Sequence, residues 1–230
     1  MPVRVWKEIQ KVLWQIRGGM KKIMFNDAYG LTQATIEGYK KNTRRAEFTA
    51  EEQQVLNEAD DVYMDGDDVV AHFDSAEDVR FDTRYKVGEV VAVAQPYADI
   101  EELAMLQRNP FHESYFEEED IADEPGWRNK MFVKAKLMPH RIRITGIRAE
   151  RLQDISDECC IKEGVIEHPY SGYMADGIVY KNCHDKAYNG SLKIFDTPSE
   201  AFAALIDKVS GRGTWACNPW VVAYEYELIK

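Results

Sequence analysis

The 230-residue sequence lacks several features that would assign it to a class at once. No stretch approaches the ~20 apolar residues that a bilayer-spanning helix needs, and no apolar N-terminal segment ends in a small-residue cleavage site. Neither a P-loop nor a G-x-G-x-x-G motif is present, so nothing indicates that glycines cradle a phosphate. We therefore expect a cytoplasmic protein that makes no contact with a membrane.

Cysteine is scarce and follows no known pattern. The four cysteines show no C-x-x-C spacing, and Cys159 and Cys160 are neighbours in sequence, which rarely bridge one another. His168, Cys183 and His184 add further soft ligands, but the spacing of the set matches no zinc pattern. We therefore expect reduced thiols, no bound metal and no cofactor.

Positive charge is in the minority, with 29 Lys and Arg against 40 Asp and Glu and a net charge of −11. This total argues against a protein that coats nucleic acid, because such binding depends on cations that displace counterions from phosphates. The acids are concentrated, however, in residues 51–82 (twelve acids, one base) and 98–124 (ten acids, one base). The formal charges of these two segments are −11 and −9, which sum to −20. Because the whole chain has a net charge of −11, the remaining residues carry +9, and an anionic ligand is expected to bind among them.

The order of patterns along the chain predicts one domain over residues 20–230, preceded by an N-terminal extension over 1–19 that is either helical or disordered. Insertions are expected near 46–85, 98–129 and 166–195, where composition becomes acidic or rich in turn-forming residues. The two acidic insertions are also candidates for binding a protein partner.

Periodicity predicts an α+β fold. Alternating or β-branched runs indicate strands, and three capping patterns indicate helices that begin after Thr49, Ser156 and Thr197. The strands are expected near residues 23–25, 87–94, 141–148 and 220–228. Since no βαβ repetition occurs, we expect a small mixed barrel decorated by helices.

The heptapeptide "YKKNTRR", residues 39–45, is the most unusual local feature, because cations surround one threonine in an otherwise acidic chain. Composition alone leaves three interpretations open: the cluster contacts a phosphate backbone, it surrounds a reacting hydroxyl, or it is a solvated surface. The predicted strand over 141–148 adds two arginines on its polar face. The candidate anion-binding residues are Lys41, Arg44, Arg45, Arg141 and Arg143.

Four stretches carry a resemblance to a known family: "ATIEGYKKNTRR" (34–45), "YKVGEVVAVA" (85–94), "RIRITGIRAERLQDISDECCIKEGV" (141–165) and "EAFAALIDKVSGRGTWACNPWVVAYEYEL" (200–228). In order and character they resemble the ASCH family, and its phage and bacterial branch most of all. The combination of "G-x-K-x-x-T-x-R", "RLQDIS" and "NPW" carries the resemblance. It implies a mixed β-barrel similar to the PUA fold, a class associated with RNA and modified nucleosides.

One bacterial branch of this family is a hydrolase that removes acetyl from the exocyclic amine of acetylcytidine, and its lysine, threonine and glutamate fall here at Lys40, Thr43 and Glu163. The resemblance thus implies that Thr43 is a nucleophile activated by Lys40, while Glu163 shuttles a proton or positions water. Arg45 or a backbone N–H would stabilise the oxyanion. A binder of RNA or a nucleoside without catalysis, a non-catalytic phage accessory protein, and a merely solvated Glu163 remain alternatives.

The spacing of Lys40 and Thr43 also predicts the local backbone structure of the segment that contains them. Residues three apart lie on one side of a helical turn but on opposite faces of a strand. If the two side chains act together, the segment that contains them is expected to be a turn.

Overall fold

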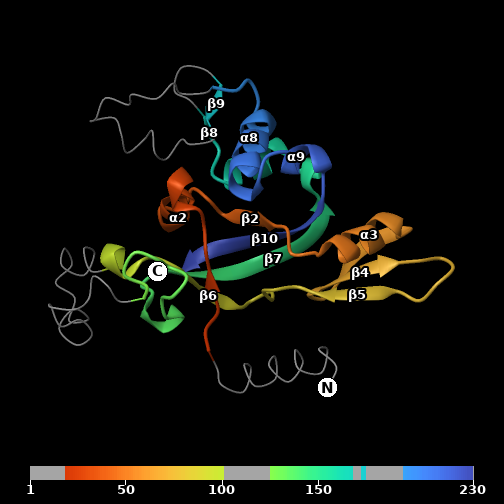
Figure 1. Ribbon diagram of the computed structural model, residues 1–230, viewed down its shortest axis with the longest axis horizontal. Coiled ribbons are helices and arrows are strands. Elements are labelled where there is room, and N and C mark those ends of the chain that lie inside the picture. Colours follow the sequence, from red (N-terminus) through yellow and green to blue (C-terminus); the bar gives the residue numbers. More distant parts are fainter. Residues whose placement is uncertain (1–18, 101–124, 168–171, 175–193, 230) are drawn as a thin grey trace. The chain divides into compact units, whose positions relative to one another are not determined.

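The computed structural model describes residues 19–100, 125–167, 172–174 and 194–229 (Figure 1). The chain divides into two compact units, which are described separately: unit 1 comprises residues 1–25, 90–142 and 230, and unit 2 comprises 26–89 and 143–229. The described residues mix helices and strands, which confirms the predicted α+β class, and their sheets are open and do not close into a barrel. No helix in these ranges combines the length and apolar character needed to cross a bilayer.

Unit 1 is built on a short parallel strand pair. Strand β1 (Lys22–Ile23) pairs with β6 (Val90–Val93), so the predicted strands 23–25 and 87–94 exist but are shorter than expected. A 3-10 helix spans Ala135–Leu137, and Lys22 Nζ donates to the carbonyl of Met131 at 2.6 Å. The buried residues that form the core of this unit are Ala92, Ala94, Tyr97, Ile100, Val133 and Met138.

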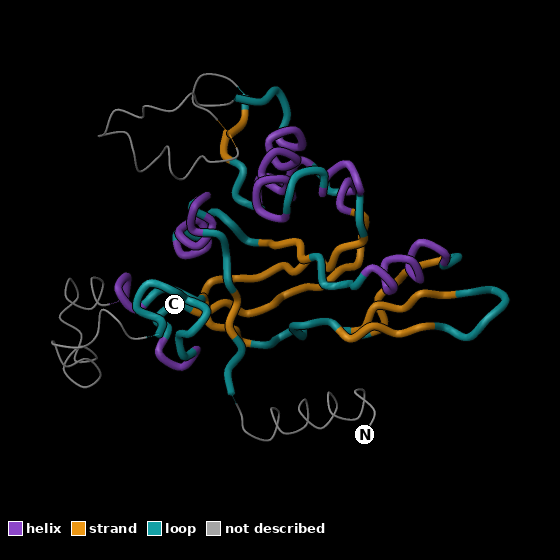
Figure 2. The backbone as a smooth tube through the Cα atoms, in the orientation of Figure 1, coloured by secondary structure: helices purple, strands orange, loops and turns teal. Residues whose placement is uncertain are grey.

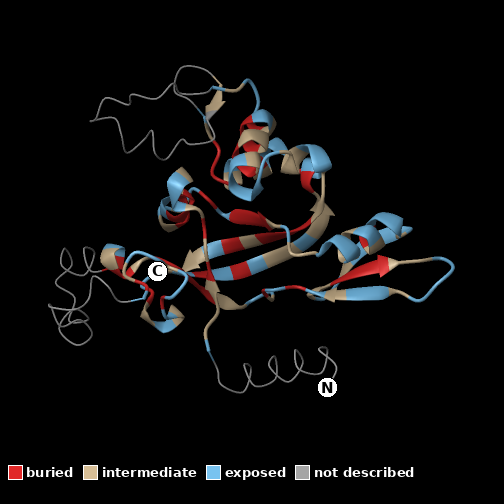
Figure 3. Cartoon of the chain, in the orientation of Figure 1, coloured by how far each residue is buried: buried red, intermediate tan, exposed pale blue. Residues whose placement is uncertain are grey.

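The main sheet of unit 2 contains β7 (Arg141–Arg151, of which the first two residues belong to unit 1), β10 (Trp220–Ile229) and β2 (Asn42–Arg45), in that order. Both long strands were predicted from their alternation. Half of the residues of β10 are buried (Figure 3), and the strand lies between two neighbouring strands. Strand β2 is antiparallel to β10, with Thr43 opposite Tyr224.

The helices of unit 2 are drawn in purple in Figure 2, and α6 and α8 begin where the capping patterns predict. The Ser156 side chain accepts from Cys159 N at the start of α6 (Asp157–Lys162), and the Thr197 side chain accepts from Glu200 N at the start of α8 (Pro198–Ser210). Helix α8 buries an apolar stripe that includes Phe202 and Leu205. The shorter helices are α2 (Leu31–Ile36), α9 (Thr214–Cys217) and 3-10 turns at Asp27–Tyr29 and Leu152–Asp154.

The expected insertion over 46–85 folds into a helix and a separate antiparallel sheet. Helix α3 (Ala50–Glu58) begins with the predicted capping box, in which Thr49 and Glu52 bond reciprocally. Strands β3 (Asp61–Asp65), β4 (Asp68–His72) and β5 (Val79–Asp82) follow in order. In the insertion near 166–195, the described residues form a small antiparallel pair, β8 (Ile166–Glu167) and β9 (Tyr173–Met174). Parts of the predicted insertions and extension lie outside the described residues: 168–171 and 175–193 of that insertion, 101–124 of the insertion near 98–129, and 1–18 of the extension.

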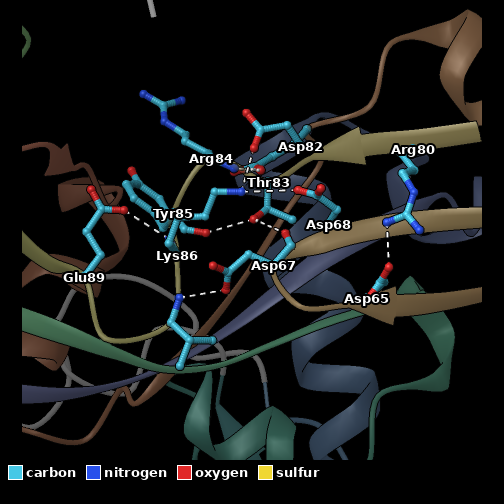
Figure 4. Close-up of polar contacts among 12 residues, drawn as sticks. Asp65, Asp67, Asp68, Arg80, Asp82, Thr83, Arg84, Tyr85, Lys86 and Glu89 are labelled. Atoms are coloured by element: carbon cyan, nitrogen blue, oxygen red, sulfur yellow. Dashed lines mark hydrogen bonds and ion pairs between the residues drawn. The ribbon is translucent and has the colours of Figure 1, made fainter. Parts of the chain in front are cut away.

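A network of polar contacts joins the three-stranded sheet to the segment that follows it (Figure 4). The Thr83 hydroxyl lies 2.7 Å from the Asp67 carbonyl oxygen, and the Asp67 side chain accepts from Val87 N at 2.9 Å. Lys86 Nζ lies 2.6 Å from an Asp82 carboxylate oxygen. These contacts fix the path of residues 83–87, and this path places Tyr85 against Tyr224 of β10, with ring centroids 5.2 Å apart.

Candidate active site

The segment that carries the cationic cluster connects α2 to β2. The Lys40 backbone N–H donates to the carbonyl of Ala34, and Lys41 N donates to the carbonyl of Lys162 at 2.8 Å. Lys40 therefore lies in the connection between α2 and β2. Thr43 does not, because it is the second residue of strand β2, so the prediction of one turn that contains both residues is wrong.

Glu163 is the C-cap residue that directly follows α6, and it is only 4% exposed, so the interpretation of a solvated glutamate is wrong. Gly164 follows with φ of +105°, a conformation that L side chains rarely adopt and that turns the chain sharply after the helix. A Cβ on Gly164 would lie 3.3 Å from Leu31 Cδ2 and 3.9 Å from Lys40 Cδ. The glycine thus allows the end of α6 to approach the Lys40 side chain closely.

Lys40 and Glu163 form a buried ion pair although 123 residues separate them in sequence. Lys40 Nζ lies 2.5 Å from Glu163 Oε2 and donates to the Glu163 carbonyl oxygen at 2.9 Å. Arg44 Nη1 lies 3.1 Å from the second carboxylate oxygen, Glu163 Oε1. The same guanidinium also donates from Nε to Glu150 Oε1 at 2.6 Å. Two cations and two carboxylates therefore form one contiguous group, whose formal charges cancel.

Burial shifts the pKa values of the two cations in this group. Burial lowers the pKa of Lys40 below its usual value, the Glu163 carboxylate opposes that effect, and repulsion from Arg45 and Arg44 lowers the pKa further. Burial also disfavours the charged form of Arg44, but Glu163 and Glu150 together raise the pKa of that guanidinium. Lys40 is accordingly the cation of the group whose pKa is lowered, whereas the pKa of Arg44 is raised.

Thr43 is buried, and strand alternation places its side chain on the face of its cross-strand partner Tyr224, opposite the face of Arg44. Within the described residues, no hydrogen bond joins the Thr43 hydroxyl to Lys40 or Glu163. The electrostatic effect of Glu163 nevertheless extends to Tyr226 on this face. The Tyr226 hydroxyl, which belongs to the same face as Tyr224, lies 3.1 Å from Thr35 Oγ1. Burial raises the pKa of Tyr226, and the Glu163 charge raises it further.

The five candidate anion-binding residues do not share one environment. Arg44 is buried and engaged by two carboxylates, which leaves it poorly suited to contact a phosphate. Lys41 is exposed, Arg45 is partly buried, and Arg143 is exposed with Nη1 3.7 Å from Glu227. Arg141 is exposed in unit 1.

Sequence reasoning missed three polar residues of this region. Glu150 binds Arg44, and it was missed because it lies two residues beyond the predicted strand over 141–148. Asn42 is 1% exposed, and neither atom of its amide is hydrogen-bonded within the described residues. Glu47 Oε1 is likewise buried and without a hydrogen-bond partner among the described residues.

The thiol and histidine candidates do not form a site in the part of the chain that the structure describes. Burial raises the pKa of the Cys160 thiol to about 12, which makes it a poor nucleophile and a poor metal ligand. No group of three or more His, Cys, Asp or Glu side chains in the described ranges could hold a metal ion. His168, Cys183 and His184 lie outside those ranges.

Comparison with known proteins adds nothing to this geometry. A scan against protein families, a search of curated proteins and a search of solved structures each returned no match.

Proposed function

We propose that this chain is an ASCH-type domain of the PUA-like class that binds a modified nucleoside and hydrolyses an amide on its base, with Thr43 as nucleophile. The observation that carries the proposal is the buried Lys40–Glu163 ion pair, three residues from Thr43 in the chain. An ion pair is expensive to bury, and buried pairs with perturbed pKa values are concentrated at functional sites.

In the proposed reaction, Lys40 in its neutral form accepts the Thr43 hydroxyl proton while Thr43 Oγ attacks the acyl carbonyl carbon. The carbon–nitrogen bond then breaks as the Lys40 ammonium returns that proton to the departing amine, which leaves an ester on Thr43. Water hydrolyses the ester and restores the hydroxyl, so the net reaction consumes one water and yields an amine and a carboxylic acid. Burial supports this role because it lowers the pKa of Lys40 toward the range of a general base.

The charges around the site favour a small, uncharged substrate over a long nucleic acid. The positive charges of Lys40 and Arg44 are balanced by Glu163 and Glu150, so this group attracts a polyphosphate backbone only weakly. An acylated nucleoside has no phosphate, so its binding does not depend on a net positive charge at the site.

The second candidate function is a non-catalytic accessory protein that binds a protein partner through its acidic insertions. One observation favours it: the insertion over 46–85 forms its own sheet, and its strand ends carry exposed carboxylates such as Asp61, Asp65 and Asp82. A basic partner would fit this surface.

The test is incubation with cytidine acetylated on its exocyclic amine, a panel of other acylated nucleosides and modified RNA, followed by chromatography of the products. We expect the free amine from the wild type and none from Thr43→Val, which removes the hydroxyl but keeps the side-chain shape. Lys40→Met should also be inactive, whereas Lys41→Met, at the exposed neighbouring lysine, should keep wild-type activity. Product formation by Thr43→Val, or none by the wild type with any substrate, would refute the proposal.

A further inference from the structure

Two adjacent apolar side chains of unit 1 are exposed to solvent. Met131 is 62% exposed and Phe132 is 60% exposed, the highest values for large hydrophobic residues in the part of the chain that the structure describes. We call this pair the apolar tip. Single exposed apolar residues are ordinary on protein surfaces, whereas two large ones side by side indicate a contact surface.

The loop that carries the apolar tip is anchored to the core of unit 1. Lys22 Nζ donates to the carbonyl of Met131 at 2.6 Å and to that of Val133 at 2.9 Å. Lys134 N donates to the Tyr97 hydroxyl at 2.8 Å, and Val133 is buried in the same cluster as Tyr97. These contacts fix the backbone on both sides of the tip, so they hold its two side chains in an exposed position.

Positive charge flanks the apolar tip. Residues 125–142 contain five bases and no acid, although acids outnumber bases in the whole chain. Arg128, Lys134 and Lys136 are exposed, and no ion pair joins any of them to an acid among the described residues. The segment therefore combines exposed apolar area with positive charge that no described acid neutralises.

The sequence of residues 4–17 has the same combination, although these residues lie outside the described part of unit 1. It contains four bases, one acid and two tryptophans, Trp6 and Trp14. The other apolar residues follow a helical spacing: Val5, Ile9, Val12, Leu13 and Ile16. A basic amphipathic pattern with tryptophans is typical of segments that lie in the surface of a lipid bilayer.

The two residues of the apolar tip also favour a bilayer over a nucleic acid. A nucleobase stacks on an aromatic ring, so a single-stranded RNA would use Phe132 and gain little from Met131. A bilayer accepts both side chains, because transfer of any apolar area out of water is favourable. Cations beside such a tip are attracted to anionic lipid headgroups.

We propose that unit 1 binds the surface of an anionic lipid bilayer, with the apolar tip inserted among the headgroups and Arg128, Lys134 and Lys136 facing the lipid anions. This inference does not depend on the proposed function. It departs from the expectation of no membrane contact, which was drawn from the lack of a spanning run, because a surface contact requires no such run. The cations act against the nine acids of residues 101–124, and a vesicle titration measures that balance.

The test is sedimentation of the full chain with vesicles of phosphatidylcholine alone and of phosphatidylcholine mixed with phosphatidylserine. We expect the wild type to bind the mixed vesicles more tightly, and this binding to weaken as salt is added. The double variant Met131→Ser with Phe132→Ser should bind them on the order of 100-fold more weakly, because it removes the apolar area that inserts. Val87→Ser is the matched control, since Val87 is 53% exposed in unit 2, and it should bind as the wild type does.

Single charge variants test the contribution of the cations. Lys134→Gln and Lys136→Gln should each weaken binding to the mixed vesicles about fivefold and leave binding to phosphatidylcholine unchanged. Arg212→Gln, which removes an exposed base of unit 2, should change neither.

Three results would overturn the inference: no binding of the wild type to either vesicle, equal binding to both, or wild-type binding by the double variant, since the contact would then belong to another part of the chain. The melting temperature of the double variant should match that of the wild type, because both replaced side chains are exposed. If it does not fold, Phe132→Trp replaces it. Lipids brominated in their acyl chains should quench the added tryptophan fluorescence, and its absence of quenching would refute insertion of the tip.

Fluorescence anisotropy with a labelled single-stranded RNA distinguishes the other anionic partner. We expect the same weak RNA binding from the wild type and from the double variant. RNA binding that the double variant loses, together with no binding of the wild type to vesicles, would assign the apolar tip to a nucleic acid and refute the lipid contact.

Discussion

The replacement Glu163→Gln tests the buried ion pair most directly. The carboxylate lies 2.5 Å from Lys40 Nζ and 3.1 Å from Arg44 Nη1, and all three side chains are 5% exposed or less. At an effective dielectric constant of about 20, each contact has a gross Coulomb energy of roughly 5–7 kcal/mol. Most of this energy offsets the cost of burying the charges. The net loss on removing one partner of a buried pair is about 3–5 kcal/mol.

For a chain of this length, 1 kcal/mol corresponds to about 2–4 °C in melting temperature, so Glu163→Gln should lower it by roughly 6–20 °C. The double variant Lys40→Met with Glu163→Gln should recover part of this loss, because it no longer buries an unpaired ammonium. Arg44 keeps Glu150 as a partner in both variants, which confines the difference between them to Lys40.

The pH dependence gives the experiment its sharpest readout. Glu163 opposes the lowering of the Lys40 pKa, so its removal moves the folded-state pKa further below the usual 10.5. Between the lowered pKa and 10.5 the unfolded chain binds one more proton than the folded chain, and stability then rises with pH. The slope is at most about 1.4 kcal/mol per pH unit. The cost of Glu163→Gln should therefore be larger at neutral pH and shrink toward pH 10.

Denaturant unfolding of the wild type, Glu163→Gln and the double variant at several pH values measures this effect. The double variant has no Lys40 to titrate, so its stability relative to the wild type should show a weaker rise with pH than that of Glu163→Gln. A cost below about 1 kcal/mol, or one equal at neutral and alkaline pH, would show that the pair is not buried and charged as described.

Three further predictions follow from local geometry and charge. Thr49→Ala should cost about 1 kcal/mol of stability because it removes the capping box of α3, while Thr49→Ser should be nearly neutral in urea unfolding. Gly164→Ala should cost at least about 1 kcal/mol in the same assay, because an L residue is strained at φ +105° and its Cβ would press on Leu31; wild-type stability would refute that geometry. The KM for acetylcytidine should change less than about twofold between low and high salt, because the Lys40 group is neutral; a steep rise would indicate contact with a free cation.

Local rules explain what could be predicted from the sequence. The helices that begin after Thr49, Ser156 and Thr197 were predicted because a cap and its partner lie within four residues of each other. The long strands β7 and β10 were predicted because their alternation extends over many residues. Strands β3 and β4 were missed although Gly66 and Asp67 between them form a two-residue turn signal, since the acids around the turn suggested only a solvated insertion.

The candidate site residues Lys40, Thr43 and Glu163 were predicted from the family resemblance, because no local pattern indicates which residues distant in sequence lie together. Nothing local in "YKKNTRR" indicates that Lys40 lies against Glu163, and nothing indicates that Arg44 is bonded to Glu150, which is 106 residues away. The position of Thr43 was predicted incorrectly as a turn, because spacing alone did not reveal that β2 begins two residues after Lys40.

The cationic cluster of residues 39–45 shows that a run of cations in the sequence does not have to form a positive surface in the folded protein. Lys41 remains exposed, but Lys40 and Arg44 point into the protein, and acids brought from β7 and from the end of α6 cancel their charges. A polyanion is attracted by the net charge of a region, whereas a neutral amide needs buried donors, acceptors and a general base in fixed positions. The neutral buried group therefore favours chemistry on an uncharged ligand over binding along a phosphate backbone, even though the sequence of residues 39–45 alone favours neither.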